Sequence, residues 1–86
     1  MPFLHTLSVE PRDNYRLWVI FNNATSGEID LSGELWGEMF EPLKDPAMFK
    51  TAQQHPDLGT VVWANGADFA PEFLFELLQK QTKTAA

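Results

Sequence analysis

Cysteine is absent from this chain of 86 residues, which excludes disulfide bonds, thiolate zinc sites and a cysteine nucleophile. Basic residues are also few, because six Lys and Arg stand against twelve Asp and Glu and leave a net charge of −6. Phosphate contacts need clustered Lys and Arg, so this composition predicts no direct binding to nucleic acid. The lack of cysteine fits a cytoplasmic protein, and we expect that compartment.

Long apolar runs are missing as well. No run approaches the roughly 18 residues of a membrane span, so we expect no membrane insertion. Residues 1–13 have no basic start and no small-residue cleavage site, so we expect no signal peptide. The length predicts a single domain over residues 1–86.

Aromatic residues are the chain's main resource for a core: seven Phe, three Trp and one Tyr. A chain of this size buries only about 60–65% of its unfolded surface. Each ring removes on the order of 150–250 Å² from water, so we expect the rings to dominate the core. Without disulfides or an evident metal site, a homodimer is the other common source of stability.

Alternation of apolar and polar residues predicts three strands in the first third of the chain. Residues 3–10 are expected to form a half-buried strand, with Phe3, Leu7 and Val9 on one face and His5 in the same row. A turn follows, and residues 15–21 are expected to form a central strand covered on both faces, because both rows are largely apolar. Residues 28–31 complete an antiparallel meander.

The remainder predicts helices and a hairpin. In residues 32–45 we expect one apolar turn at helical spacing, made by Leu35, Trp36, Met39 and Phe40. A short helix over 46–53, capped by Asp45, comes next. Asn65-Gly66 predicts a type I′ hairpin between a strand at 60–63 and a return arm at 67–69. Residues 71–81 form an amphipathic helix that packs on the sheet.

The predicted fold class is therefore α+β: an antiparallel β-meander of three strands plus a short β-hairpin, packed against a C-terminal amphipathic helix and one short helix.

Catalytic motifs are not evident. His5 and His55 lie fifty residues apart, in no pattern that holds a metal. The serines lack a nucleophile motif, and no glycine-rich phosphate loop is present. We therefore predict no enzymatic activity, no catalytic residue, no metal and no cofactor.

An acidic stretch over residues 28–45 holds half of all acids, with Lys44 as its one base. Its spacing does not match a calcium loop. A solvated rim is the usual outcome for such charges. The alternative is a surface for a basic partner protein, with Glu34, Glu38 and Glu41 as its candidates.

The segment 63–72 is the most distinctive. Local physics explains it as a hairpin turn and a helix start, with Trp63 packed under the helix and Asp68 accepting a hydrogen bond from a helix N–H. The functional alternative is a recognition surface made by Trp63, Asn65 and Asp68.

Several runs, in this order and spacing, resemble the bacterial family of domain of unknown function 2442 (DUF2442): FEPLKDPAMF (40–49), GTVVW (59–63), NGAD (65–68) and PE (71–72). The resemblance covers nearly the whole chain and implies a small α+β protein with no established activity. Some members precede a helix-turn-helix DNA-binding domain, and others look like one half of a toxin–antitoxin-style gene pair. We expect the second kind, because this sequence ends after its last helix.

Three hypotheses for function follow. The first is a protein-binding module, an antitoxin-like or regulatory partner of a second small protein. The second is a small ligand-binding or enzymatic domain with a pocket near Trp63 and Asp68. The third is a purely structural homodimer.

Overall fold

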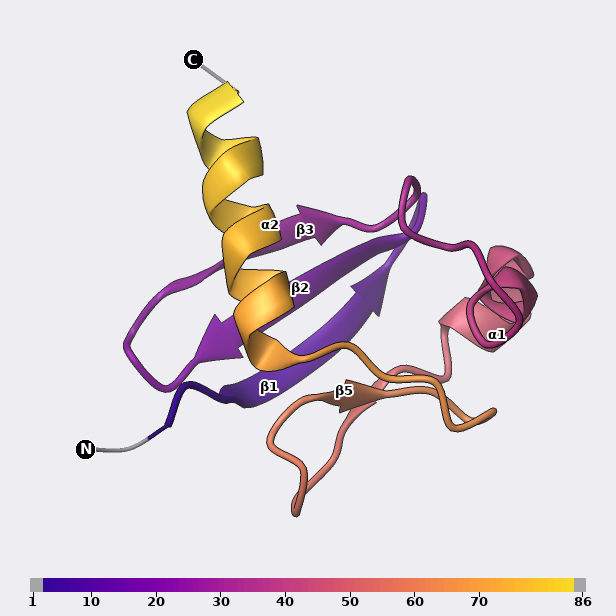
Figure 1. The fold of residues 1–86 in the computed structure, drawn as a ribbon, viewed down its shortest axis with the longest axis horizontal. Coiled ribbons are helices and arrows are strands. Elements are labelled where there is room, and N and C mark those ends of the chain that lie inside the picture. Colours follow the sequence, from indigo (N-terminus) through magenta and orange to yellow (C-terminus); the bar gives the residue numbers. More distant parts are fainter. Residues whose placement is uncertain (1–2, 85–86) are drawn as a thin grey trace.

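The computed structural model describes residues 3–84, which form a meander with a helix across it and a smaller hairpin beside it. Strands β1 (Thr6–Arg12), β2 (Arg16–Phe21) and β3 (Ser26–Asp30) pair antiparallel in the order β1-β2-β3. Helix α2 (Pro71–Thr84) crosses this sheet, while helix α1 (Pro46–Phe49) and strand β5 (Val61–Val62) lie to one side of it (Figure 1). Strand β4 (Gln53–Gln54) pairs with β5, and a 3₁₀ helix, η1 (Glu41–Lys44), precedes α1. The predicted α+β class is confirmed.

The central strand β2 buries one row only. Leu17, Val19 and Phe21 are fully buried, and Phe21 packs edge-to-face on Phe75 of α2 at 5.4 Å between ring centroids. The prediction that β2 is covered on both faces is wrong, since Ile20 on the opposite face is 37% exposed. A three-stranded antiparallel sheet with one covering layer leaves its other face to water.

Strand β1 differs from its predicted pattern because of an irregularity in its register between Thr6 and Ser8. The extra residue, Leu7, is 57% exposed, although it was expected to face the core. A bulge of this kind shifts the alternation by one position, so Thr6 takes the buried place instead. Its hydroxyl donates to Gln54 Oε1, which ties the sheet to the hairpin.

The turn between β1 and β2 lies later than predicted, since Pro11 still belongs to β1. Asn14 and Tyr15 both have positive φ, at 62° and 61°. The Tyr15 ring packs edge-to-face on Phe49 at 5.5 Å, and its hydroxyl donates to the backbone carbonyl of Lys44. These contacts join the sheet to α1.

The segment 32–40 contains no helix, so the predicted apolar turn at helical spacing is wrong. Leu35 is buried, but Trp36 is 70% exposed and Met39 is 47% exposed. Gly37 has a φ of +90°, a conformation that interrupts a right-handed helix. The chain becomes regular again only at η1.

The second half contains shorter elements than expected. The Asp45 cap is present, with its carboxylate accepting from Ala47 N at 3.1 Å, but α1 ends at Phe49. The hairpin pairs β4 with β5, and only a single bridge joins Val62 to Asp68. The type I′ prediction is wrong, because Gly66 has positive φ and Asn65 does not.

Trp63 lies in the core at 2% exposure, as the structural interpretation expected. Its indole Nε1 donates to the Phe49 carbonyl at 2.9 Å. Its ring lies 5.8 Å from those of Phe49 and Phe69, measured between centroids. The three rings join α1 to the segment that precedes α2.

Asp30 fixes the exit from β3. Its carboxylate accepts a hydrogen bond from Ser32 N at 2.9 Å. This bond, with smaller contributions from the Ser32 side chain and Arg16, lowers the pKa of Asp30.

No helix among residues 3–84 is long and apolar enough to cross a membrane.

Trp63 is buried and Trp36 is exposed, so we expect a large effect on stability from substitution of the first and a small effect from substitution of the second. Trp63→Ala removes a buried ring and one of the two hydrogen bonds that the Phe49 carbonyl accepts, since the bond from Ala52 N remains. We therefore expect a loss of about 3–5 kcal/mol in the free energy of unfolding. Trp36→Ala is the matched control and should stay within about 0.5 kcal/mol of wild type. Urea denaturation followed by circular dichroism measures both, and equal effects would contradict the described core.

Two glycines of the same loop provide a second test. A Cβ added at Gly33 or at Gly37 would meet no atom within 4 Å, but only Gly37 has positive φ. We expect Gly37→Ala to destabilise the fold by about 1–2 kcal/mol through backbone strain alone. Gly33→Ala should be neutral or slightly stabilising, and a cost as large as that at Gly37 would argue against the loop conformation.

The lowered pKa of Asp30 predicts a pH-dependent contribution to stability. The ionised carboxylate stabilises the fold above the unfolded-state pKa, and this contribution is lost as the pH falls through the folded-state value. The destabilisation caused by Asp30→Asn should therefore be larger at pH 7 than at about pH 2. Urea titrations at both pH values test this, and a destabilisation independent of pH would count against it.

Candidate functional site: an apolar groove with an acidic rim

The main candidate site is a groove of about 420 Å³ between the loop of residues 32–40 and the start of α2. Its volume lies within the range of about 300–1,000 Å³ that is typical of ligand sites. The lining combines exposed apolar side chains with two carboxylates: Glu34, Trp36, Gly37, Glu38, Met39, Phe40, Phe69 and Phe73.

Stacked rings form one wall of this groove. Phe40 and Phe69 stack at 4.5 Å between centroids with an interplanar angle of 12°, and Phe69 stacks on Phe73 at 5.1 Å. Phe69 also packs edge-to-face on the buried Trp63. The wall is therefore continuous with the core and rigid, while its outer rings stay half-buried.

The opposite wall is the loop 32–40, which is anchored at both ends. Leu35 is 2% exposed and holds the loop in the core. Asn65 Nδ2 donates to the Met39 carbonyl at 2.9 Å, while its Oδ1 accepts from Ala67 N at 3.1 Å. Between these anchors the loop presents Trp36, at 70% exposure, beside the groove.

Two carboxylates complete the rim. Glu34 is half-buried and Glu38 is exposed. The ion pairs of the described residues involve Glu10, Glu28 and Glu41 instead. Glu34 and Glu38 therefore have no cationic partner within the described part of the chain.

The six residues that the sequence nominated for a partner surface separate into three groups. Glu34 and Glu38 line the groove, and Asn65 supports it through its bond to the loop. Asp68 is exposed next to Phe69 and makes no side-chain hydrogen bond to another described residue, so the predicted helix cap is not formed. Two lie elsewhere: Trp63 is buried in the core, and Glu41 is paired with Lys44 at 3.4 Å.

The sequence did not predict that the apolar side chains of the groove form a binding site. The sequence predicts that Trp36, Met39 and Phe40, together with Leu35, form one apolar turn at helical spacing. The same sequence contains a signal against a long helix, since Gly33 and Gly37 interrupt it, and Gly37 has a positive φ in the structure.

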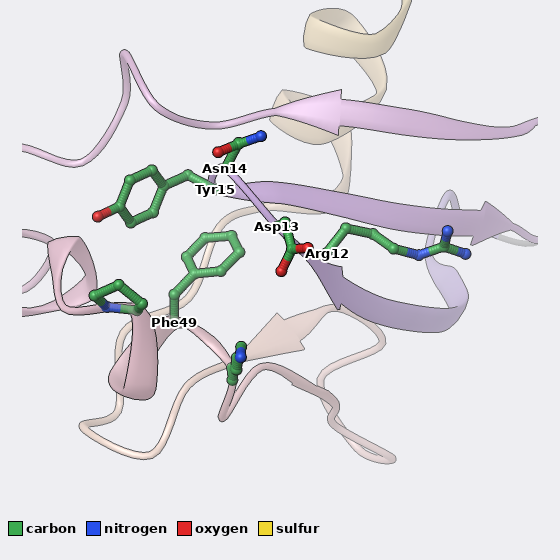
Figure 2. Close-up of a pocket in the computed structure, with 7 residues that line it drawn as sticks. Arg12, Asp13, Asn14, Tyr15 and Phe49 are labelled. Atoms are coloured by element: carbon green, nitrogen blue, oxygen red, sulfur yellow. The ribbon is translucent and has the colours of Figure 1, made fainter.

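A second hollow, of about 230 Å³, lies between the β1–β2 turn and α1. Figure 2 shows the Tyr15 and Phe49 rings side by side, with the Arg12 side chain pointing away from Phe49. The Arg12 guanidinium lies instead over Trp18 at 5.6 Å from the ring centroid, and its Nε is 3.3 Å from Glu10 Oε1. Arg12 is the one arginine in the lining of this hollow, and it is already paired with Trp18 and Glu10. This hollow is therefore the weaker candidate.

The histidines have structural partners. The backbone N–H groups of Asp57 and Leu58 donate to His55 Nδ1 at 3.1 and 3.0 Å, which holds the β4–β5 turn. His5 Nδ1 lies 3.0 Å from the Phe3 carbonyl. Among the described residues no three His, Asp or Glu side chains gather in a group that could hold a metal ion.

A solved structure shares this fold. The chain is similar to the crystal structure of "Putative DNA Binding Protein NE0471" from Nitrosomonas europaea ATCC 19718, with a TM-score of 0.82 and 22% sequence identity. The match covers 94% of this chain and 52% of that one, so the chain spans about half the length of that protein. At this identity the likeness shows the fold alone. No curated protein matches the sequence.

This comparison corrects one prediction. The composition predicted no direct binding to nucleic acid, but the same fold forms part of a protein that is described as a "Putative DNA Binding Protein". The net charge of a whole chain does not decide what a single surface of the fold contacts, and function belongs to sites and not to folds. The exclusion of nucleic acid is therefore withdrawn.

The family assignment rests on the sequence itself. The model of the family described as "Protein of unknown function (DUF2442)" matches residues 7–79, which include all of the meander except its first residue, the groove loop and most of α2. That description names no enzymatic activity. The chain belongs to the DUF2442 family, as the resemblance of its motifs indicated.

Proposed function

We propose that this domain is a protein-binding module whose groove receives an apolar side chain from a segment of a partner protein. In this role it acts as an antitoxin-like or regulatory partner, by occupying a second small protein. The observation that carries the proposal is the exposure of Trp36 and Met39 beside a rigid wall of phenylalanine rings.

Exposed apolar side chains that gather into one patch mark interaction surfaces, whereas single exposed ones are common. Tryptophan is enriched among the residues that dominate binding energy, and methionine adapts its shape to different partners. The groove concentrates both residue types beside preformed rings, so little ordering is needed on binding.

The enzymatic alternative near Trp63 and Asp68 has less support. Trp63 is buried with its indole N–H already bonded, and neither residue lines the groove or the hollow beside Tyr15. The structural homodimer would bury the same groove against a second copy of the chain. Sedimentation of the wild type and of Trp36→Ala detects such a dimer.

The test is selection of binding peptides from a random library of twelve-residue peptides, followed by calorimetric titration of the best synthetic peptide. Trp36→Ala and Met39→Ala should each weaken its binding at least tenfold, which is about 1.4 kcal/mol or more. The matched controls are Phe3→Ala and Leu58→Ala, because Phe3 and Leu58 are exposed apolar residues outside the groove lining, at 88% and 54%.

Two results from the peptide and sedimentation experiments would contradict the proposal, and a third could come from a DNA-binding assay. One is a selected peptide whose affinity is the same in the groove variants as in wild type. The other is a stable homodimer, seen by sedimentation, that dissociates on Trp36→Ala and binds no peptide. A mobility-shift assay with duplex DNA runs in parallel, and DNA binding with no peptide binding would assign the domain to a different class of partner.

A further inference from the structure

The carboxylates at the rim of the groove indicate which kind of segment binds there. Glu34 and Glu38 both line the groove and have no cationic partner among the described residues, whereas Glu10, Glu28 and Glu41 each have one. Carboxylates beside apolar walls act through a reduced dielectric, so they attract a cation more strongly than isolated surface acids do. A purely apolar segment would bury or crowd these charges without compensation.

The Trp36 ring adds a second attraction for the same kind of group. It is 70% exposed and lines the groove together with both carboxylates. A cation over the face of a tryptophan ring is stabilised by the ring's quadrupole. Arginine suits both features, because its planar guanidinium stacks on rings and donates to carboxylates through a fixed fork.

The same molecule already contains one such arrangement. On the open face of the sheet, the Arg12 guanidinium lies 5.6 Å from the centre of the Trp18 ring while its Nε lies 3.3 Å from Glu10. Trp36 with Glu34 and Glu38 offers the same ring and carboxylate groups, but without an arginine from the described chain.

From this charge complementarity we infer that the groove selects a peptide segment in which an arginine adjoins an apolar side chain. The apolar side chain packs on the rings of Phe40, Phe69 and Phe73, and the guanidinium stacks on Trp36 and bonds to Glu34 or Glu38. The inference rests on the proposed function and names the chemistry of its partner. Phosphate groups are disfavoured at this rim by the same carboxylates.

The probe is the blocked peptide acetyl-Ser-Leu-Arg-Leu-Ser-amide, compared with its twin in which citrulline, an uncharged isostere, replaces arginine. Binding is followed by ¹H–¹⁵N correlation spectra of the full chain, with the Trp36 indole N–H as the local reporter. We expect the arginine peptide to bind at least tenfold more tightly than the citrulline peptide, and this preference should shrink as salt is raised.

Variants that remove these charges test whether Glu34 and Glu38 cause the preference for the arginine peptide. In the double variant Glu34→Gln and Glu38→Gln, the arginine peptide should bind no better than the citrulline peptide, whose own affinity should be unchanged. The control is Asp57→Asn with Glu76→Gln, which removes the same net charge at exposed positions outside the groove lining and should keep the tenfold preference.

The outcomes separate this inference from the proposed function. Equal binding of the two peptides at the groove overturns the arginine preference and leaves the protein-binding role intact. Loss of the preference in the control double variant also overturns it, because net charge and not the rim would then be the cause. A groove that binds neither these peptides nor any library peptide overturns both proposals.

Discussion

A connected series of aromatic rings holds this molecule together. It runs from Tyr15 through Phe49 and Trp63 to Phe69, and it joins the sheet, α1 and the start of α2. A domain this small, without disulfides, has few other means of ordering a middle segment that lacks long strands or helices. The hydrogen bond from the Trp63 indole to the Phe49 carbonyl fixes the orientation of the central ring.

The candidate site lies at the outer end of that series. Phe69 belongs both to the core, through Trp63, and to the groove, through Phe40 and Phe73. The groove wall is therefore preorganised by the same contacts that stabilise the fold. The loop of residues 32–40 has no regular structure, and its anchors at Leu35 and Asn65 hold Trp36 beside the rings.

Membership of the DUF2442 family places the chain among proteins whose function is unknown, and the likeness to part of the Nitrosomonas europaea structure concerns the fold. A binding module would be compatible with either context, since one small domain can serve as a separate partner or as part of a longer chain. The groove is the feature by which such a module would act, and its charge and aromatic character describe the partner.

The sequence alone determined the meander, the Asp45 cap, the amphipathic α2 and the burial of Trp63, because each depends on local periodicity or on the size of one side chain. Only the tertiary structure decided the rest. The bulge at Leu7 reversed a face of β1, and Gly37 turned a helical pattern into an exposed loop. Phe73 of α2 and Phe40 of the loop each stack on Phe69 and so make the groove wall. These features depend on contacts between segments far apart in the chain or on a single backbone angle, and neither leaves a periodic signal in the sequence.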